Sequence, residues 1–147
     1  MLRLAPVLIA LFSTACTKEV ELSDVVDKLY GKHGRGVAGG RVYTVPEKYP
    51  RRDLAGIVHA CSRGDSNLCF HGGQLIDAIA VETQVAAIAT RYGNSFYQRA
   101  CDLGHMLTCK CLAVLEHRHD FAACLVRQEA ASGQRRRTRV RPKNRWP

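Results

Sequence analysis

The sequence predicts an all-α fold, a short α-solenoid of antiparallel helix pairs that are each stapled by a disulfide. Two cysteine pairs, Cys61/Cys69 and Cys101/Cys109, share one spacing, and the second pair lies 40 positions after the first (101 − 61 = 40; 109 − 69 = 40). The apolar residues around both pairs recur at helical intervals. A repeat period of roughly 20–50 residues is typical of stacked supersecondary units, and such units usually bind other proteins.

The repeat extends beyond the cysteines. Its pattern is Ala-Cys-x-x-Gly-x4-Cys-x5-Leu, with matches at Ala60/Ala100, Gly64/Gly104 and Leu75/Leu115. The glycine predicts where the chain leaves the first helix of each pair, because glycine readily adopts a left-handed backbone conformation. Ser66 and Thr108 are then expected to cap the second helix of each pair.

The repeat region is expected to cover residues 52–131 as five helices. Asp53 opens the first helix, and the third has a candidate break at Gly93 and Asn94. Asp120 begins the fifth, after a turn expected over residues 117–120.

The sequence of residues 17–51 predicts a linker with little structure. A short helical pattern over residues 22–29 is followed by five glycines within residues 31–40, which favour turns over regular structure. Residues 42–45 have strand propensity but no evident partner strand, so we expect them to be irregular.

The first residues have the layout of an export signal. Arg3 precedes an apolar run over residues 4–12 that is too short to span a bilayer, and small residues follow it. Cys16 then stands where a bacterial lipoprotein is cleaved and lipidated, although Ser13 departs from the usual cleavage box.

We therefore expect a signal peptide over residues 1–15 and a lipid anchor at Cys16, within a flexible linker over 16–51. The expected location is the bacterial cell envelope, facing the periplasm and anchored to a membrane through Cys16. Plain secretion is the alternative.

The number of cysteines agrees with export. The chain has seven, and without Cys16 six remain, an even number suited to an oxidising compartment. The two repeated pairs match by symmetry, which leaves Cys111 and Cys124. These two lie almost equally far from the expected turn at 117–120, so a helical hairpin would bring them to bridging distance. The alternative is that one or two of the six are reduced core residues.

A family resemblance adds to this interpretation. Residues 96–104, Phe-Tyr-Gln-Arg-Ala-Cys-Asp-Leu-Gly, followed by Cys109, resemble the Sel-like repeats. These repeats are related to the tetratricopeptide repeat and occur in the disulfide-rich Hcp-type exported proteins of bacteria. The resemblance implies a solenoid with one bridge per helix pair. The period here exceeds that of the family by about one helical turn, and Cys111 and Cys124 lie outside the family pattern.

The predicted function is a scaffold for protein–protein interaction, with an envelope protein or peptide as its partner. We expect no catalytic residue, cofactor or metal. Hcp-type proteins have also been associated with penicillin binding and weak β-lactamase activity, which is the alternative function. A serine β-lactamase needs Ser-x-x-Lys, and no serine of this chain has lysine three residues later.

Two further motifs resemble functional sites, and we interpret both as chance matches. A zinc cluster is conceivable from Cys109, Cys111, His117, His119 and Cys124, but an export signal argues against free thiolates. Residues 34–39 match the dinucleotide fingerprint in spelling, yet neither the preceding strand nor the following helix of that fold is expected here.

The net charge of +9 belongs to the C-terminal tail. Residues 132–147 carry seven basic residues and no acid, whereas residues 17–131 carry 14 basic and 13 acidic residues. The composition predicts a disordered basic tail that contacts an anionic surface such as lipid headgroups. We expect no nucleic-acid partner outside the cytoplasm. A tail without function is the alternative.

Overall fold

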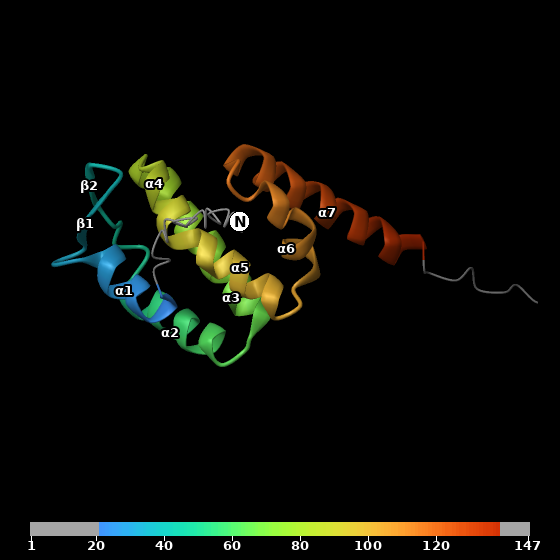
Figure 1. The fold of residues 1–147 in the computed structure, drawn as a ribbon, viewed down its shortest axis with the longest axis horizontal. Coiled ribbons are helices and arrows are strands. Elements are labelled where there is room, and N and C mark those ends of the chain that lie inside the picture. Colours follow the sequence, from blue (N-terminus) through green and yellow to red (C-terminus); the bar gives the residue numbers. More distant parts are fainter. Residues whose placement is uncertain (1–20, 139–147) are drawn as a thin grey trace, which may run out of the picture.

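The computed structural model describes residues 21–138, and this part of the chain is mostly helical with one small two-stranded sheet (Figure 1). In chain order the elements are α1 (Leu22–Tyr30), β1 (Arg35–Ala38), β2 (Arg41–Thr44), α2 (Arg51–Ser62), α3 (Ser66–Thr83), α4 (Ala86–Ile88), the π-helix η1 (Ala89–Gly93), α5 (Asn94–Asp102), α6 (Met106–Cys111), the 3₁₀-helix η2 (Leu112–Val114) and α7 (Arg118–Thr138).

Helix α3 lies at the centre of the fold. It packs against α2 on one side and against η1 and α5 on the other, and Ile76 and Ile79 are fully buried there. Two consecutive glycines of α3, Gly72 and Gly73, face the aromatic rings of α5. A Cβ on Gly72 would lie 2.4 Å from Phe96, and a Cβ on Gly73 would lie 2.6 Å from Tyr97. The absence of side chains at these two positions lets α3 and α5 approach closely.

The structure contains three disulfides. Cys61–Cys69 joins the end of α2 to the start of α3, and Cys101–Cys109 joins α5 to α6, each with a Cα–Cα distance of 4.7 Å. The third, Cys111–Cys124, joins α6 to α7. The symmetry of the repeat had suggested the first two pairs, and the third joins the two cysteines that this symmetry left over.

The turns beside the two repeated disulfides are also as expected. Gly64 and Gly104 adopt positive φ angles of 102° and 89°, which favour glycine. The predicted caps are wrong by one and three positions. Asp65, not Ser66, caps α3 by accepting a hydrogen bond from the Leu68 amide at 3.0 Å. His105, not Thr108, caps α6 through its Nδ1.

Residues 21–51 correct the prediction of a linker with little structure. Helix α1 buries its apolar face, and β1 pairs with β2 as an antiparallel hairpin. The Tyr43 side chain of β2 is buried, and its hydroxyl donates a hydrogen bond to the Leu29 carbonyl of α1 at 2.7 Å. The glycines that we interpreted as breakers supply the turns, since Gly39 and Gly40 connect the strands at positive φ. The missing partner of residues 42–45 is the strand just before them.

The C-terminal helix also continues further than expected. Helix α7 runs to Thr138, so residues 132–138 are helical rather than disordered. Residues 139–147 lie outside the described residues, as do the predicted signal peptide over 1–15 and the predicted lipid site at Cys16. Within residues 21–138, no helix has the length and apolar character to cross a membrane.

Close packing at Gly73 gives a first prediction. We expect Gly73→Ala to lower the free energy of unfolding by about 1–2 kcal/mol, because the new Cβ overlaps the Tyr97 ring. The ring has little freedom to yield, since its hydroxyl is hydrogen-bonded to Asp77. The matched control is Gly56→Ala in α2, where nothing lies within 4 Å. That change should stabilise the protein by roughly 0.5–1 kcal/mol through helix propensity. Urea unfolding measures the free energy of unfolding of both variants. A change of the same sign in the two would contradict the packing argument.

The repeated disulfide gives a second prediction. Replacing Cys101 and Cys109 together by alanine removes the cross-link between α5 and α6. We expect a loss of about 2.5 kcal/mol, because the unfolded chain regains the freedom of a nine-residue ring. Melting temperatures of both proteins, with and without reductant, measure this. Equal melting of the parent protein in the two conditions would show that the disulfides contribute nothing.

Candidate functional site

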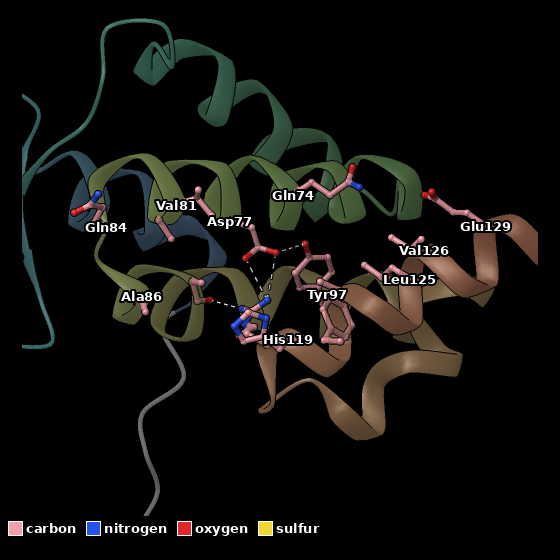
Figure 2. A pocket seen from close by; sticks show the side chains of 15 residues that line it. Gln74, Asp77, Val81, Gln84, Ala86, Tyr97, His119, Leu125, Val126 and Glu129 are labelled. Carbon is pink, nitrogen blue, oxygen red and sulfur yellow. Dashed lines mark hydrogen bonds and ion pairs between the residues drawn. The ribbon is translucent and has the colours of Figure 1, made fainter.

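A groove of about 760 Å³ lies between α3 and α7 (Figure 2). One wall comes from α3 and the residues that follow it, the other comes from α7, and Tyr97 of α5 lies between them. The lining residues are Gln74, Asp77, Ala80, Val81, Gln84, Ala86, Ala89, Tyr97, Arg118, His119, Phe121, Ala122, Leu125, Val126 and Glu129. Most of these are apolar, with the polar side chains concentrated at the base and the ends.

The two walls carry exposed aliphatic side chains. Val81 of α3 is 76% exposed, and Val126 of α7 is 66% exposed. Leu125, next to Val126, is half-buried against the body of the protein. Residues 129–133 of α7 are all exposed, so the helix extends past the core as an arm. Figure 1 shows this arm leaving the body at one end of the long axis.

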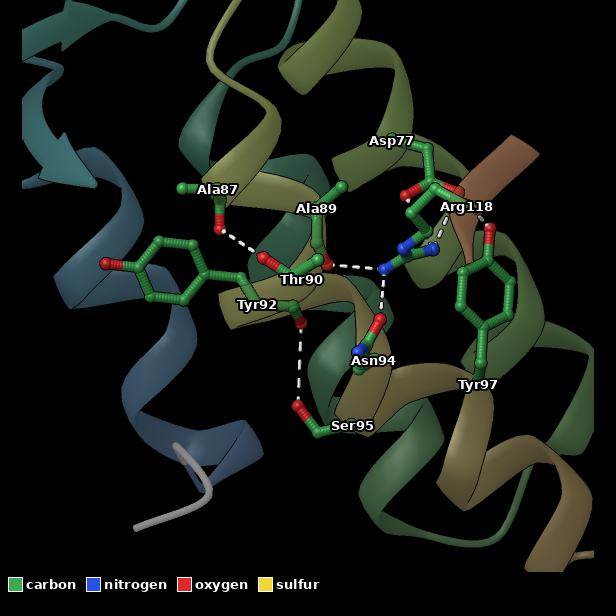
Figure 3. A network of polar contacts seen from close by, with 9 residues as sticks. All are labelled: Asp77, Ala87, Ala89, Thr90, Tyr92, Asn94, Ser95, Tyr97 and Arg118. Carbon is green, nitrogen blue, oxygen red and sulfur yellow. Dashed lines mark hydrogen bonds and ion pairs between the residues drawn. The ribbon is translucent and has the colours of Figure 1, made fainter. Parts of the chain in front are cut away.

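Arg118, at the first position of α7, connects the arm to the body. Its guanidinium donates hydrogen bonds to the Ala89 carbonyl, to the Asn94 side chain and to Asp77 (Figure 3). The Ala89 carbonyl and the Asn94 side chain lie at the two ends of the π-helical turn η1. One side chain therefore joins α7 to α3, η1 and the start of α5. The turn occupies the position of the candidate break at Gly93 and Asn94.

Asp77 is the acidic partner of this contact. Its Oδ1 lies 3.2 Å from Arg118 Nη1, an ionic contact without hydrogen-bond geometry, and its Oδ2 accepts a hydrogen bond from the Tyr97 hydroxyl at 2.6 Å. Burial raises the pKa of Asp77, against the opposing effects of Tyr97 and Arg118. Burial, and then the negative charge of Asp77, raise the pKa of Tyr97. The arrangement therefore holds an ion pair at the base of an apolar groove and fixes the orientation of the Tyr97 ring.

The cysteines predicted as site residues lie away from the groove lining. Cys61, Cys69, Cys101, Cys109, Cys111 and Cys124 are all disulfide-bonded. The cysteines of the conceivable zinc cluster are therefore not thiolates, and residues 21–138 contain no group of three or more side chains arranged to hold a metal ion. No serine is among the residues that line the groove, so the groove does not bring together the parts of a serine hydrolase.

The sequence interpretation missed the polar residues of the groove. Asp77 is the only charged residue in the apolar run over residues 75–81, and such an isolated acid signals a buried partner. The partner, Arg118, lies 41 residues later in the sequence. We had assigned it to a turn, and no local pattern connects it to Asp77.

Comparison of this chain with protein-family models, with curated protein sequences and with solved structures finds no match. The resemblance to Sel-like repeats therefore stays a prediction from the sequence.

The Arg118 contacts give a third prediction. Arg118→Ala should lower the free energy of unfolding by about 2 kcal/mol, because it leaves the half-buried Asp77 carboxylate without its cation. Arg118→Lys should recover only part of this loss, since a lysine cannot reach three acceptors with one planar group. Arg127→Ala is the control, because Arg127 is an exposed arginine of the same helix. Equal stability of the Arg118→Ala and Arg127→Ala proteins would show that the network does not hold α7.

Proposed function

We propose that this protein is an exported, lipid-anchored scaffold of the bacterial envelope, and that the groove between α3 and α7 binds an apolar peptide segment of a partner protein. The observation that carries this proposal is the groove itself, with aliphatic side chains exposed on both walls. Exposed apolar surface of this kind is costly in water, and a bound segment removes it from solvent.

The base of the groove supports a specific partner rather than a nonspecific one. The Asp77 and Arg118 pair, with the Tyr97 hydroxyl, connects the two walls of the groove and so fixes their separation. A wall position that is set before binding lowers the ordering cost of the complex. Gln84 and Glu129 lie at the two ends of the groove, and in this proposal their polar side chains form hydrogen bonds with the backbone of the bound segment (Figure 2).

The arm of α7 also supports binding. Its second half projects beyond the core, and a helix without tertiary contacts is only marginally stable in water. A peptide in the groove would pack against Leu125 and Val126, just before the projecting residues, and would add tertiary contacts where the helix leaves the core.

We infer the wider setting from the sequence and the disulfides together. The pairs α2–α3 and α5–α6 are the two units of the proposed short solenoid, and α7 extends the array after the second unit. The three disulfides suit an oxidising compartment outside the cytoplasm. The lipid anchor at Cys16 rests on the sequence pattern alone.

The test of this function is photocrosslinking in the native envelope. The photoreactive amino acid p-benzoylphenylalanine is placed at Val81 on one wall, at Val126 on the other wall, or at Ala123 as a control. Ala123 is exposed on α7 but does not line the groove. We expect the same partner protein to be crosslinked from Val81 and from Val126, and not from Ala123.

A second pair of variants excludes a general effect on folding. Val126→Asp adds a charge to the groove wall, and Ala123→Asp adds the same charge to an exposed position of the same helix that does not line the groove. We expect only Val126→Asp to reduce the adduct formed from Val81, by about tenfold or more. No adduct from either wall, or equal adducts from all three positions, would contradict a groove-binding scaffold.

A further inference from the structure

The hairpin β1–β2 carries an exposed apolar pair. Val37 and Val42 lie directly opposite each other in the antiparallel register, and they are 55% and 71% exposed. Their neighbours Ala38 and Tyr43 face the other way and are buried. The hairpin therefore has one face fixed on the body and one free face, with two aliphatic side chains at its centre.

The charged residues of the hairpin and of the turns beside it are all basic. Residues 31–46 contain Lys32, Arg35 and Arg41, together with His33, and no acidic residue. Arg35 is exposed and points to the same side of β1 as Val37, two residues away. None of the three cations forms an ion pair with an acid of residues 21–133. Arg41 donates a hydrogen bond to the neutral Gln84 carbonyl, so its charge is not cancelled.

The hairpin is held rigidly in place. The buried Tyr43 hydroxyl bonds to α1, and a Cβ on Gly36 would lie 2.4 Å from the Tyr43 hydroxyl oxygen, which shows how tightly the inner face packs. The free face thus meets any partner without first becoming ordered. Figure 1 shows the hairpin at the opposite end of the molecule from the α7 arm.

We propose that the free face of the hairpin contacts an anionic lipid surface. A bilayer interface supplies both environments that this face needs. The valines enter the boundary of the acyl chains, while Lys32 and Arg35 meet lipid phosphates. Nucleic acid would satisfy the cations, but two valines offer no stacking platform for bases. This inference is independent of the peptide groove, and it does not require acylation of Cys16.

Vesicle co-sedimentation tests the proposal. The full chain carries Cys16→Ser so that no acyl chain contributes. Its binding to vesicles of phosphatidylglycerol and phosphatidylcholine is compared with its binding to phosphatidylcholine alone. We expect Val37→Ser/Val42→Ser and Lys32→Gln/Arg35→Gln each to lower the partition coefficient for the anionic vesicles by about tenfold. All four side chains are exposed, so the fold should be unaffected, and circular dichroism melting checks this.

The N-terminal apolar run and the basic tail are the same in every variant, so they contribute equally to the binding of the hairpin variants and of the matched controls. Met106→Ser removes an exposed apolar side chain of α6, and Arg52→Gln/Arg63→Gln removes two exposed charges elsewhere. These controls should bind anionic vesicles like the parent. Hairpin variants that bind like the controls would overturn the proposal. Equally strong binding of the parent to phosphatidylcholine alone would overturn it as well.

Discussion

The close approach of α3 and α5 is the constraint on which the rest of the structure depends. Because Gly72 and Gly73 have no side chains, the rings of Phe96 and Tyr97 rest against the backbone of α3. This contact places the Tyr97 hydroxyl beside Asp77, and Asp77 in turn receives Arg118 from α7. The position of the arm, and so the width of the groove, follows from two missing side chains on the central helix.

Hydrophobic burial and disulfides stabilise different parts of this small fold. The N-terminal part, from α1 to α3, buries aliphatic and aromatic side chains of several elements in one core. The C-terminal part has less core, since α6 is short and half of α7 lies beyond the body. Two of the three disulfides lie in that part, where a small core most needs a constraint on the unfolded chain.

Local patterns in the sequence were sufficient for some of these features. The repeated cysteine spacing and the glycines at 64 and 104 identify the corners of both helix pairs, because a disulfide and a left-handed turn leave local signatures. The hairpin was missed for the opposite reason. Without a known partner strand, Gly39 and Gly40 indicate only that regular structure ends. The pairing of Val37 with Val42 cannot be predicted from either strand alone.

The groove was beyond the reach of local patterns as well. It depends on Asp77 and Arg118, which only the packing of α7 brings together. The capping residues Asp65 and His105 also could not be identified from local sequence alone. Several residues near a helix start can accept the first amide hydrogens, and the exact backbone path decides among them.

The arrangement of the last two disulfides has a mechanical consequence. Cys109 and Cys111 are separated by a single residue, so the cross-link to α5 and the cross-link to α7 are almost continuous along α6. A pulling force on the arm passes through sulfur–sulfur bonds into the middle of the protein, instead of peeling one helix from another. Under tension, the non-covalent contacts between α7 and the body would therefore break before α7 separated from α6.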